Sequence, residues 1–95
     1  MNRAKILDTA KATVTVDRAA THGNAEDSFC EIAGHWTWWL QSKLKPGEAL
    51  YAYDVAQMMV GFKQARGKAN RKHADNFVDQ AGYSSLAGEI ALREK

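Results

Sequence analysis

The chain has 95 residues, 45% hydrophobic and 25% charged, with a formal net charge of +2. This composition is typical of one globular domain, and it excludes a disordered segment and a membrane-spanning protein. The single cysteine, Cys30, excludes an internal disulfide and a cysteine-rich zinc site, and the mild positive charge lacks the dense basic stripe of strong nucleic-acid binders. We therefore expect one cytoplasmic domain over residues 1–95 that does not contact membranes and for which nucleic acid is a disfavoured partner.

Hydrophobic periodicity predicts two helices in the first half of the chain. The first covers about residues 2–14, although "TVTV" is also typical of a short strand. The second covers about residues 25–44, with Asn24 as its N-cap. Its apolar positions recur at i, i+3, i+4, i+7, i+11 and i+15, which is a strong amphipathic pattern. "KPG" ends this helix, because Pro46 disfavours helical backbone at Lys45.

Two more amphipathic stretches follow, at about residues 49–67 and 73–93. The apolar stripe of the third helix is Leu50, Val55, Met58, Met59 and Phe62, and that of the fourth is Val78, Gly82, Tyr83, Leu86, Ala87 and Ile90. Short connections favour antiparallel neighbours. The sequence therefore predicts an all-α fold, a small four-helix bundle that forms homo-oligomers.

Charged residues interrupt the apolar stripes of the third and fourth helices. Asp54 lies at the edge of the third stripe, Arg66 follows Phe62 in that stripe by four residues, and Asp79 is in line with the fourth. Burying a charge is costly unless it is paired or binds a ligand. One interpretation is that these residues and Lys63 form structural salt bridges with one another or with Arg18. The other is that two helices project them into a shared cleft that binds a nucleotide.

Three tryptophans close together cannot all face one core. Trp36 falls on the apolar stripe of the second helix, which favours a place in the core, and Trp38 and Trp39 follow it. Because aromatic residues are enriched at interfaces, we expect this group of three, Trp36, Trp38 and Trp39, to mark an oligomer interface. The alternative is a surface on which a base stacks, and the same choice applies to Tyr83.

The usual signatures of metal or catalytic sites are absent from the sequence. His22, His35 and His73 are scattered, and no pair has the i, i+4 spacing of a helical zinc site. No glycine-rich phosphate loop and no nucleophile elbow occur, so we name no catalytic residue. Cys30 is expected to be a buried small residue rather than a reactive thiol.

Four blocks, "DRAATHGNAEDSF", "HWTWWL", "YDVAQMMVGFKQAR" and "DNFVDQAGYSSLA", occur in this order along nearly the whole chain. Together they resemble a family of small phage and prophage helical proteins of unknown function. The last block is also distantly similar to the all-α, MazG-like nucleoside triphosphate pyrophosphohydrolases and to phage domains associated with nucleotide modification.

The resemblance to pyrophosphohydrolases implies a magnesium site built from Glu-x-x-Glu and Glu-x-x-Asp. This sequence departs from that pattern, because Asn76 replaces the glutamate three residues before Asp79, and Glu31 has Ser28 and Gly34 three residues away. If the chain were such an enzyme, its Mg²⁺ ligands would be Asp27, Glu31, Asp54, Asp75 and Asp79. Otherwise we expect no metal and no cofactor.

The four blocks keep their basic residues although the carboxylate pattern of the enzymes is incomplete. A cleft with this composition should bind phosphate better than it binds Mg²⁺. We therefore expect a phage-type protein that sequesters a nucleotide without turnover, acting as an anti-defence sponge in the cytoplasm of an infected bacterium. Its ligand would be a host immune signalling nucleotide, such as a cyclic dinucleotide or an ADP-ribose derivative. The expected ligand-binding residues are Arg18, His22, Asp54, Lys63, Arg66, Asp79 and Tyr83. The alternatives are the Mg²⁺-dependent pyrophosphohydrolase and an accessory protein that binds another protein through its tryptophans.

Overall fold

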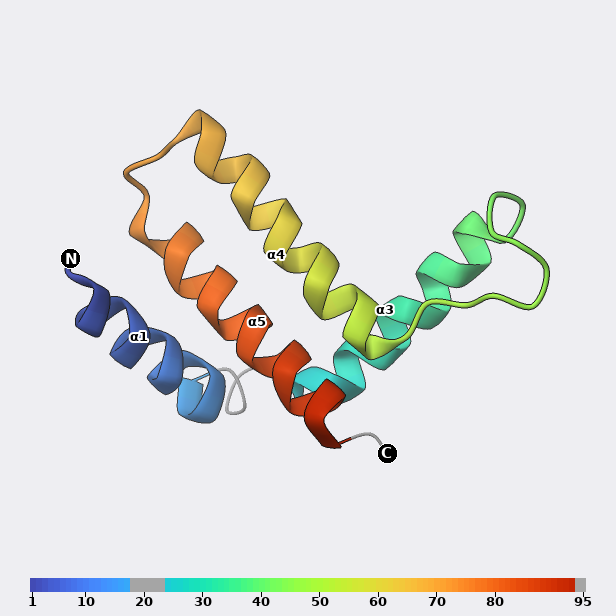
Figure 1. Ribbon diagram of the computed structural model, residues 1–95, viewed down its shortest axis with the longest axis horizontal. Coiled ribbons are helices and arrows are strands. Elements are labelled where there is room, and N and C mark those ends of the chain that lie inside the picture. Colours follow the sequence, from blue (N-terminus) through green and yellow to red (C-terminus); the bar gives the residue numbers. More distant parts are fainter. Residues whose placement is uncertain (18–23, 94–95) are drawn as a thin grey trace.

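A computed structural model of the chain describes residues 1–17 and 24–93. The helices are α1 (Arg3–Ala12), α3 (Ala25–Leu40), α4 (Ala52–Ala69) and α5 (Ala74–Arg93), and the π-helical turn η1 (Thr13–Asp17) continues α1 (Figure 1). No described residue is in a β-strand. The prediction of an all-α fold with four helices is confirmed, and "TVTV" is helical.

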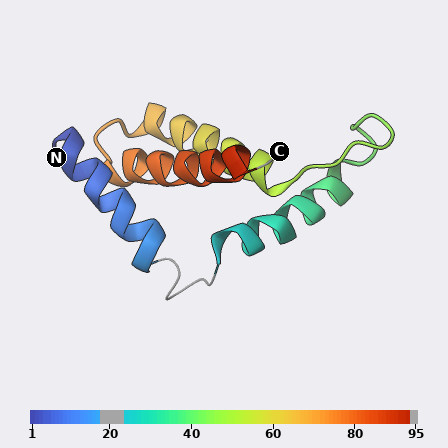
Figure 2. The ribbon, with the colours of Figure 1, turned by 60° about the horizontal axis from the view of Figure 1, so that its bottom comes forward.

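The antiparallel pair α4 and α5 forms the centre of the molecule (Figure 1). Helix α1 packs against α5, and α3 packs against the beginning of α4. Seen from a second direction, α1 and α3 lie on the same side of this pair and diverge from each other (Figure 2). The first half of α3 is therefore close to the other helices, whereas its second half projects away from them.

Side-chain caps fix where three of the helices begin. The Asn24 Oδ1 atom accepts hydrogen bonds from the backbone N–H groups of Glu26 and Asp27, at 2.8 and 3.2 Å. This confirms the predicted N-cap of α3. Asn2 caps α1 through the N–H of Lys5, and the N–H of Tyr51 donates to Asp54 Oδ2 at 2.9 Å at the start of α4.

The segment between α3 and α4 is longer than predicted. Helix α3 ends at Leu40, not at residue 44, and α4 begins at Ala52, not at residue 49. In between, the N–H of Glu48 donates to the carbonyl of Lys45 at 3.0 Å, and Gly47 has φ of 85°. Proline and glycine at the two central positions match a type II turn, which forms its own hydrogen bond in place of helical ones.

Most of the fully buried core residues are small. They come from the junction of α3, α4 and α5 and are Phe29, Ala33, Ala52, Val55, Ala56, Ala87 and Ile90. Phe29 is the one aromatic side chain among them. Cys30 is exposed, contrary to the prediction, because the neighbouring Phe29 faces the junction and Cys30 therefore points to solvent. The large apolar residues of this chain are thus mostly at its edge or its surface.

Candidate ligand-binding site

A cavity of about 150 Å³ lies between η1, the first turns of α3 and one face of α5. Its apolar wall is formed by Val14, Ala25, Phe29, Val78, Gly82 and Leu86. The rings of Phe29 and Tyr83, both in the wall, have their centroids 5.8 Å apart and are tilted by 34°. This geometry leaves an aromatic surface against which a planar group can pack.

Gly82 allows η1 to approach α5 at this cavity. A Cβ atom on Gly82 would lie 2.9 Å from Val14 Cγ1, which is closer than two carbons tolerate. The cavity therefore depends on a residue without a side chain at this position. By contrast, nothing lies within 4 Å of a Cβ built on Gly88, one and a half turns further along α5.

Apart from the Tyr83 hydroxyl, which can donate or accept, the polar side chains of the cavity wall act as hydrogen-bond acceptors. Asp79 and Glu89 contribute carboxylates. The hydroxyls of Thr13 and Thr15 already donate to the carbonyls of Thr9 and Lys11, at 2.9 and 2.6 Å, and that of Ser85 donates to Gly82 at 2.7 Å. Each hydroxyl oxygen keeps lone pairs but has used its proton. A ligand that satisfies these groups must itself carry donors.

The carboxylate of Asp79 also binds Lys63. Lys63 Nζ lies 2.9 Å from Asp79 Oδ2, and the two side chains are 18% and 27% exposed. For this pair, the predicted salt bridge between α4 and α5 is confirmed. It does not by itself exclude a ligand, because a carboxylate oxygen accepts more than one hydrogen bond.

Two other expected ligand residues, Asp54 and Arg66, do not line this cavity. Asp54 caps α4 and does not line it. The guanidinium of Arg66 lies 5.6 Å from the Phe62 ring centroid. Arg66 lines a separate, open hollow near the turn between α4 and α5, together with Asn70, His73 and Asn76. Arg18 and His22 fall outside the described residues. The structure thus brings together Lys63, Asp79 and Tyr83.

The carboxylates of the Mg²⁺ alternative lie in different surroundings. Asp79 is paired with Lys63, Asp54 caps a helix, and Asp75 lies 3.7 Å from His73 on the surface. Asp27 and Glu31 are exposed on α3. Over residues 1–17 and 24–93, no three histidine, cysteine, aspartate or glutamate side chains form a group that could hold a metal ion. The described geometry does not support this ligand set.

The three tryptophans separate into two kinds. Trp36 is half-buried and packs against the core at the helix junction. Trp38 and Trp39 are 60% and 70% exposed, and their ring centroids are 6.1 Å apart. The ring of His35 lies 5.8 Å from that of Trp38. An interface at this surface therefore remains a prediction for Trp38 and Trp39, and Trp36 belongs mainly to the core.

Four of the cavity-lining residues that sequence analysis missed lie on one stripe of α5. Val78, Gly82, Ser85 and Glu89 all line the cavity and follow the spacing i, i+4, i+7 and i+11. We assigned the first two to the core and did not consider the last two. The sequence does contain a signal for this site. On one face of the helix, apolar positions are followed by the polar residues Ser85 and Glu89.

Known proteins match this chain over most of its length. "Gene 55 protein" of Mycobacterium phage L5 is 35% identical over 89 residues, which are 94% of this chain and 54% of that protein. "Gene 55 protein" of Mycobacterium phage D29 is 29% identical over 85 residues, which are 90% of this chain and 52% of that protein. The chain spans about half the length of these curated relatives. No solved structure matches it.

These matches confirm the resemblance to phage proteins of unknown function. They do not show the distant similarity to MazG-like enzymes. Among the described helices, none combines the length and the apolar character needed to cross a bilayer. The family described as "Domain of unknown function (DUF6378)" matches residues 5–91. Because this match covers nearly all of the 95 residues, the chain belongs to the DUF6378 family.

Proposed function

We propose that this protein binds and sequesters a nucleotide without turning it over, and that the base enters the cavity beneath α5. One observation carries the proposal. The cavity combines an aromatic wall with a set of hydrogen-bond acceptors, beside the Lys63–Asp79 pair. Convergent polar groups in an apolar hollow are the common pattern of small-molecule sites.

The volume of the cavity suits one ring system rather than a whole nucleotide. A cavity of roughly 150 Å³ accepts a benzene-sized ring, whereas sites for complete drug-sized ligands occupy about 300–1,000 Å³. We therefore expect the base to lie between η1 and α5, near the rings of Phe29 and Tyr83. The sugar and the phosphate would remain outside.

The polar wall favours a base that carries an exocyclic amino group. Asp79 and Glu89 accept hydrogen bonds, and so do the hydroxyl oxygens of Thr13, Thr15 and Ser85, whose protons are already used. An amino group donates to such acceptors, whereas a carbonyl in the same place meets like partial charges and leaves them unpaired. Adenine, guanine and cytosine therefore suit this site better than uracil and thymine.

Two features at the cavity edge favour a phosphate outside it. Lys63 Nζ lies against Asp79. The N-terminal end of α3 reaches the cavity at Ala25, and the positive end of a helix dipole attracts anions. Glu26 in the same turn is held by Arg93 at 2.6 Å, so part of the local negative charge is balanced.

Sequestration is the activity that these features support best. The described carboxylates do not gather into a metal-binding group, so we expect the bound nucleotide to be recovered unchanged. The relatives in two mycobacteriophages support a role during infection. Amino-bearing signalling nucleotides of bacterial immunity, such as cyclic dinucleotides and ADP-ribose derivatives, are therefore the ligands to test first.

Calorimetric titration with matched nucleotides tests the proposal. Cytidine and uridine monophosphates differ at the 4-position, amino in one and oxo in the other. We expect the amino member of such a pair to bind at least about tenfold more tightly, because a hydrogen bond to a charged group contributes about 1.5–3 kcal/mol. Equal affinity, or no binding by any nucleotide in a panel that includes the signalling nucleotides, would overturn the proposal.

Two serine variants locate the binding. Ser85 lines the cavity and Ser84 beside it does not, and both are exposed. A leucine at position 85 places a larger side chain at the cavity wall, so Ser85→Leu is expected to abolish binding. Ser84→Leu is the control and should bind as the wild type does. If both variants bind equally well, the nucleotide lies elsewhere on the protein.

A further inference from the structure

The chain exposes more surface than a compact protein of its mass. Its solvent-accessible surface is 7150 Å². A folded monomer of 10.5 kDa is expected to expose about 5,400 Å², so the excess is roughly 1,700 Å². The radius of gyration is 14.5 Å, against about 12.4 Å for a compact domain of this length. Both values indicate an open shape.

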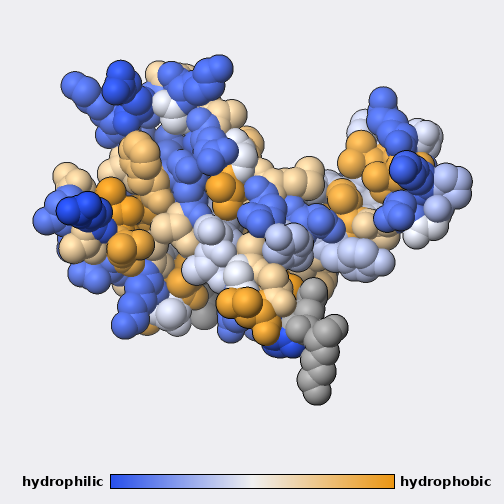
Figure 3. Space-filling view, viewed as in Figure 1, coloured by the Kyte–Doolittle hydropathy of each residue, from blue (hydrophilic) through white to orange (hydrophobic). Residues whose placement is uncertain are grey.

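The end of α3 contributes visibly to this open shape. We call the second half of α3 and the segment that follows it, residues 34–51, the arm. The arm points away from α4 and α5 in both ribbon views (Figures 1 and 2) and stands clear of the main body in the space-filling view (Figure 3). Its projecting part carries Trp38 and Trp39, which are 60% and 70% exposed, whereas Trp36 and Leu50 within the same range pack against the core.

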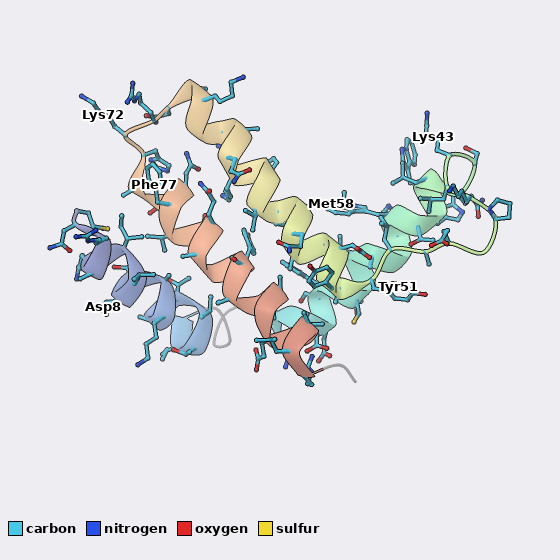
Figure 4. All side chains as sticks on the ribbon, in the orientation of Figure 1. Asp8, Lys43, Tyr51, Met58, Lys72 and Phe77 are labelled. Carbon is cyan, nitrogen blue, oxygen red and sulfur yellow. The ribbon has the colours of Figure 1, made fainter. Side chains whose placement is uncertain are left out.

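A second apolar surface lies on α4. Met58 and Phe62 are one turn apart and are 45% and 47% exposed. We call them the stripe. Met58 lies on the side of α4 turned toward the arm, across the open angle between the two (Figure 4). The arm of the same chain does not cover the stripe, which remains about half exposed, with the Arg66 guanidinium 5.6 Å from the Phe62 ring centroid.

We propose that two copies of this chain form a dimer in which the arm of each covers the stripe of the other. The excess surface carries the argument. Obligate dimers bury about 2,000–5,000 Å² in total, or about 1,000–2,500 Å² on each subunit, and the excess of roughly 1,700 Å² per chain lies within that range.

A second copy fits better than a foreign protein because one chain supplies both surfaces. A two-fold axis that places one arm on the partner's stripe necessarily places the partner's arm on the first stripe. The contact therefore occurs twice and covers the exposed aromatic residues of both chains. Their association would also enlarge a core in which alanine is the most frequent residue.

Sedimentation velocity with three variants tests this dimer. The wild type is expected to sediment with twice the mass of the 10.5 kDa chain. The arm variant Trp38→Ala/Trp39→Ala and the stripe variant Met58→Gln/Phe62→Gln should each sediment as monomers. Leu92→Ala is the control, because Leu92 is 90% exposed on α5 and belongs to neither surface, and it should remain dimeric. Circular dichroism checks that every variant keeps its helices.

Mixing the two defective variants distinguishes the reciprocal contact from others. A mixed pair retains one intact arm facing one intact stripe, so a heterodimer should reappear with weaker affinity than the wild type. A dimer in which arm contacts arm would not be restored by mixing. Failure to form this heterodimer would overturn the proposal, and so would variants that both remain dimeric. A monomeric wild type would also overturn it and would point to another protein as the partner of the arm.

Discussion

The two halves of α3 carry the same kind of amphipathic sequence and meet different surroundings. In the first half, Phe29 and Ala33 are 3% and 2% exposed and pack against α4 and α5. In the second half, Trp38 and Trp39 are 60% and 70% exposed. An apolar stripe therefore indicates which face of a helix seeks a partner, but it does not indicate whether the same chain supplies that partner.

This difference has an energetic consequence that substitutions can measure. Side chains in the first half should contribute to the stability of the single chain, and those in the second half should contribute mainly to association. The expected effects below run from the largest to the smallest. Each is best measured in the Trp38→Ala/Trp39→Ala background, so that association does not add to the free energy of unfolding.

Phe29→Ala should have the largest effect. It removes the one aromatic side chain from the fully buried core at the junction and also opens the cavity wall. We expect a loss of about 3–5 kcal/mol in the free energy of unfolding, measured by urea denaturation. The comparison is the Trp38→Ala variant, in which Trp39 is restored. Its free energy of unfolding should differ from that of the background by only about 0.5 kcal/mol. Similar effects at the two positions would contradict the division of α3.

Gly82→Ala tests the close approach of η1 to α5. The added Cβ would meet Val14 Cγ1 at 2.9 Å, so we expect a loss of about 1–3 kcal/mol in thermal or urea unfolding. Adding Val14→Ala should recover most of that loss, because the clashing methyl group is gone.

Gly88→Ala is the matched control for this position. A Cβ on Gly88 meets nothing within 4 Å, so the substitution should stabilise α5 by about 0.5–1 kcal/mol through helix propensity. If Gly82→Ala is also stabilising, η1 does not pack on α5 as described.

Among the destabilising substitutions, Thr37→Val should have the smallest effect. The Thr37 hydroxyl donates to the carbonyl of Ala33 at 2.7 Å and accepts from the N–H of Leu50 at 2.8 Å, which ties the end of the arm back to α3. Valine keeps the shape and removes both bonds, so we expect a loss of about 1 kcal/mol. Thr37→Ser retains the hydroxyl and should keep this contribution. A loss in Thr37→Ser with none in Thr37→Val would assign the effect to the methyl group and contradict the role of the two hydrogen bonds.

The sequence predicted local features better than long-range ones. The helices and the Asn24 cap depend on neighbours a few residues away, and both are confirmed. The Lys63–Asp79 pair was also foreseen as a salt bridge, because charges on facing apolar stripes need partners. The use of Asp54 as a cap was missed, although it follows Tyr51 at the spacing of a capping box.

The cavity could not be predicted from periodicity alone. It requires η1 to lie against Gly82, and that approach depends on how α1 packs on α5 across about 65 residues of sequence. The sequence indicates that not all three tryptophans can face the core, but the amphipathic pattern of the second predicted helix does not reveal that the end of this helix projects from the body. Both features depend on tertiary arrangement, which residue spacing in a single helix does not specify.

Native mass spectrometry of the protein incubated with amino-bearing nucleotides tests the nucleotide proposal most directly. We expect the wild type and Ser84→Leu to retain one nucleotide of unchanged mass per chain, and Ser85→Leu to retain none. Spectra of bare protein for the wild type, or equal retention by Ser85→Leu, would contradict a nucleotide site in the cavity beneath α5.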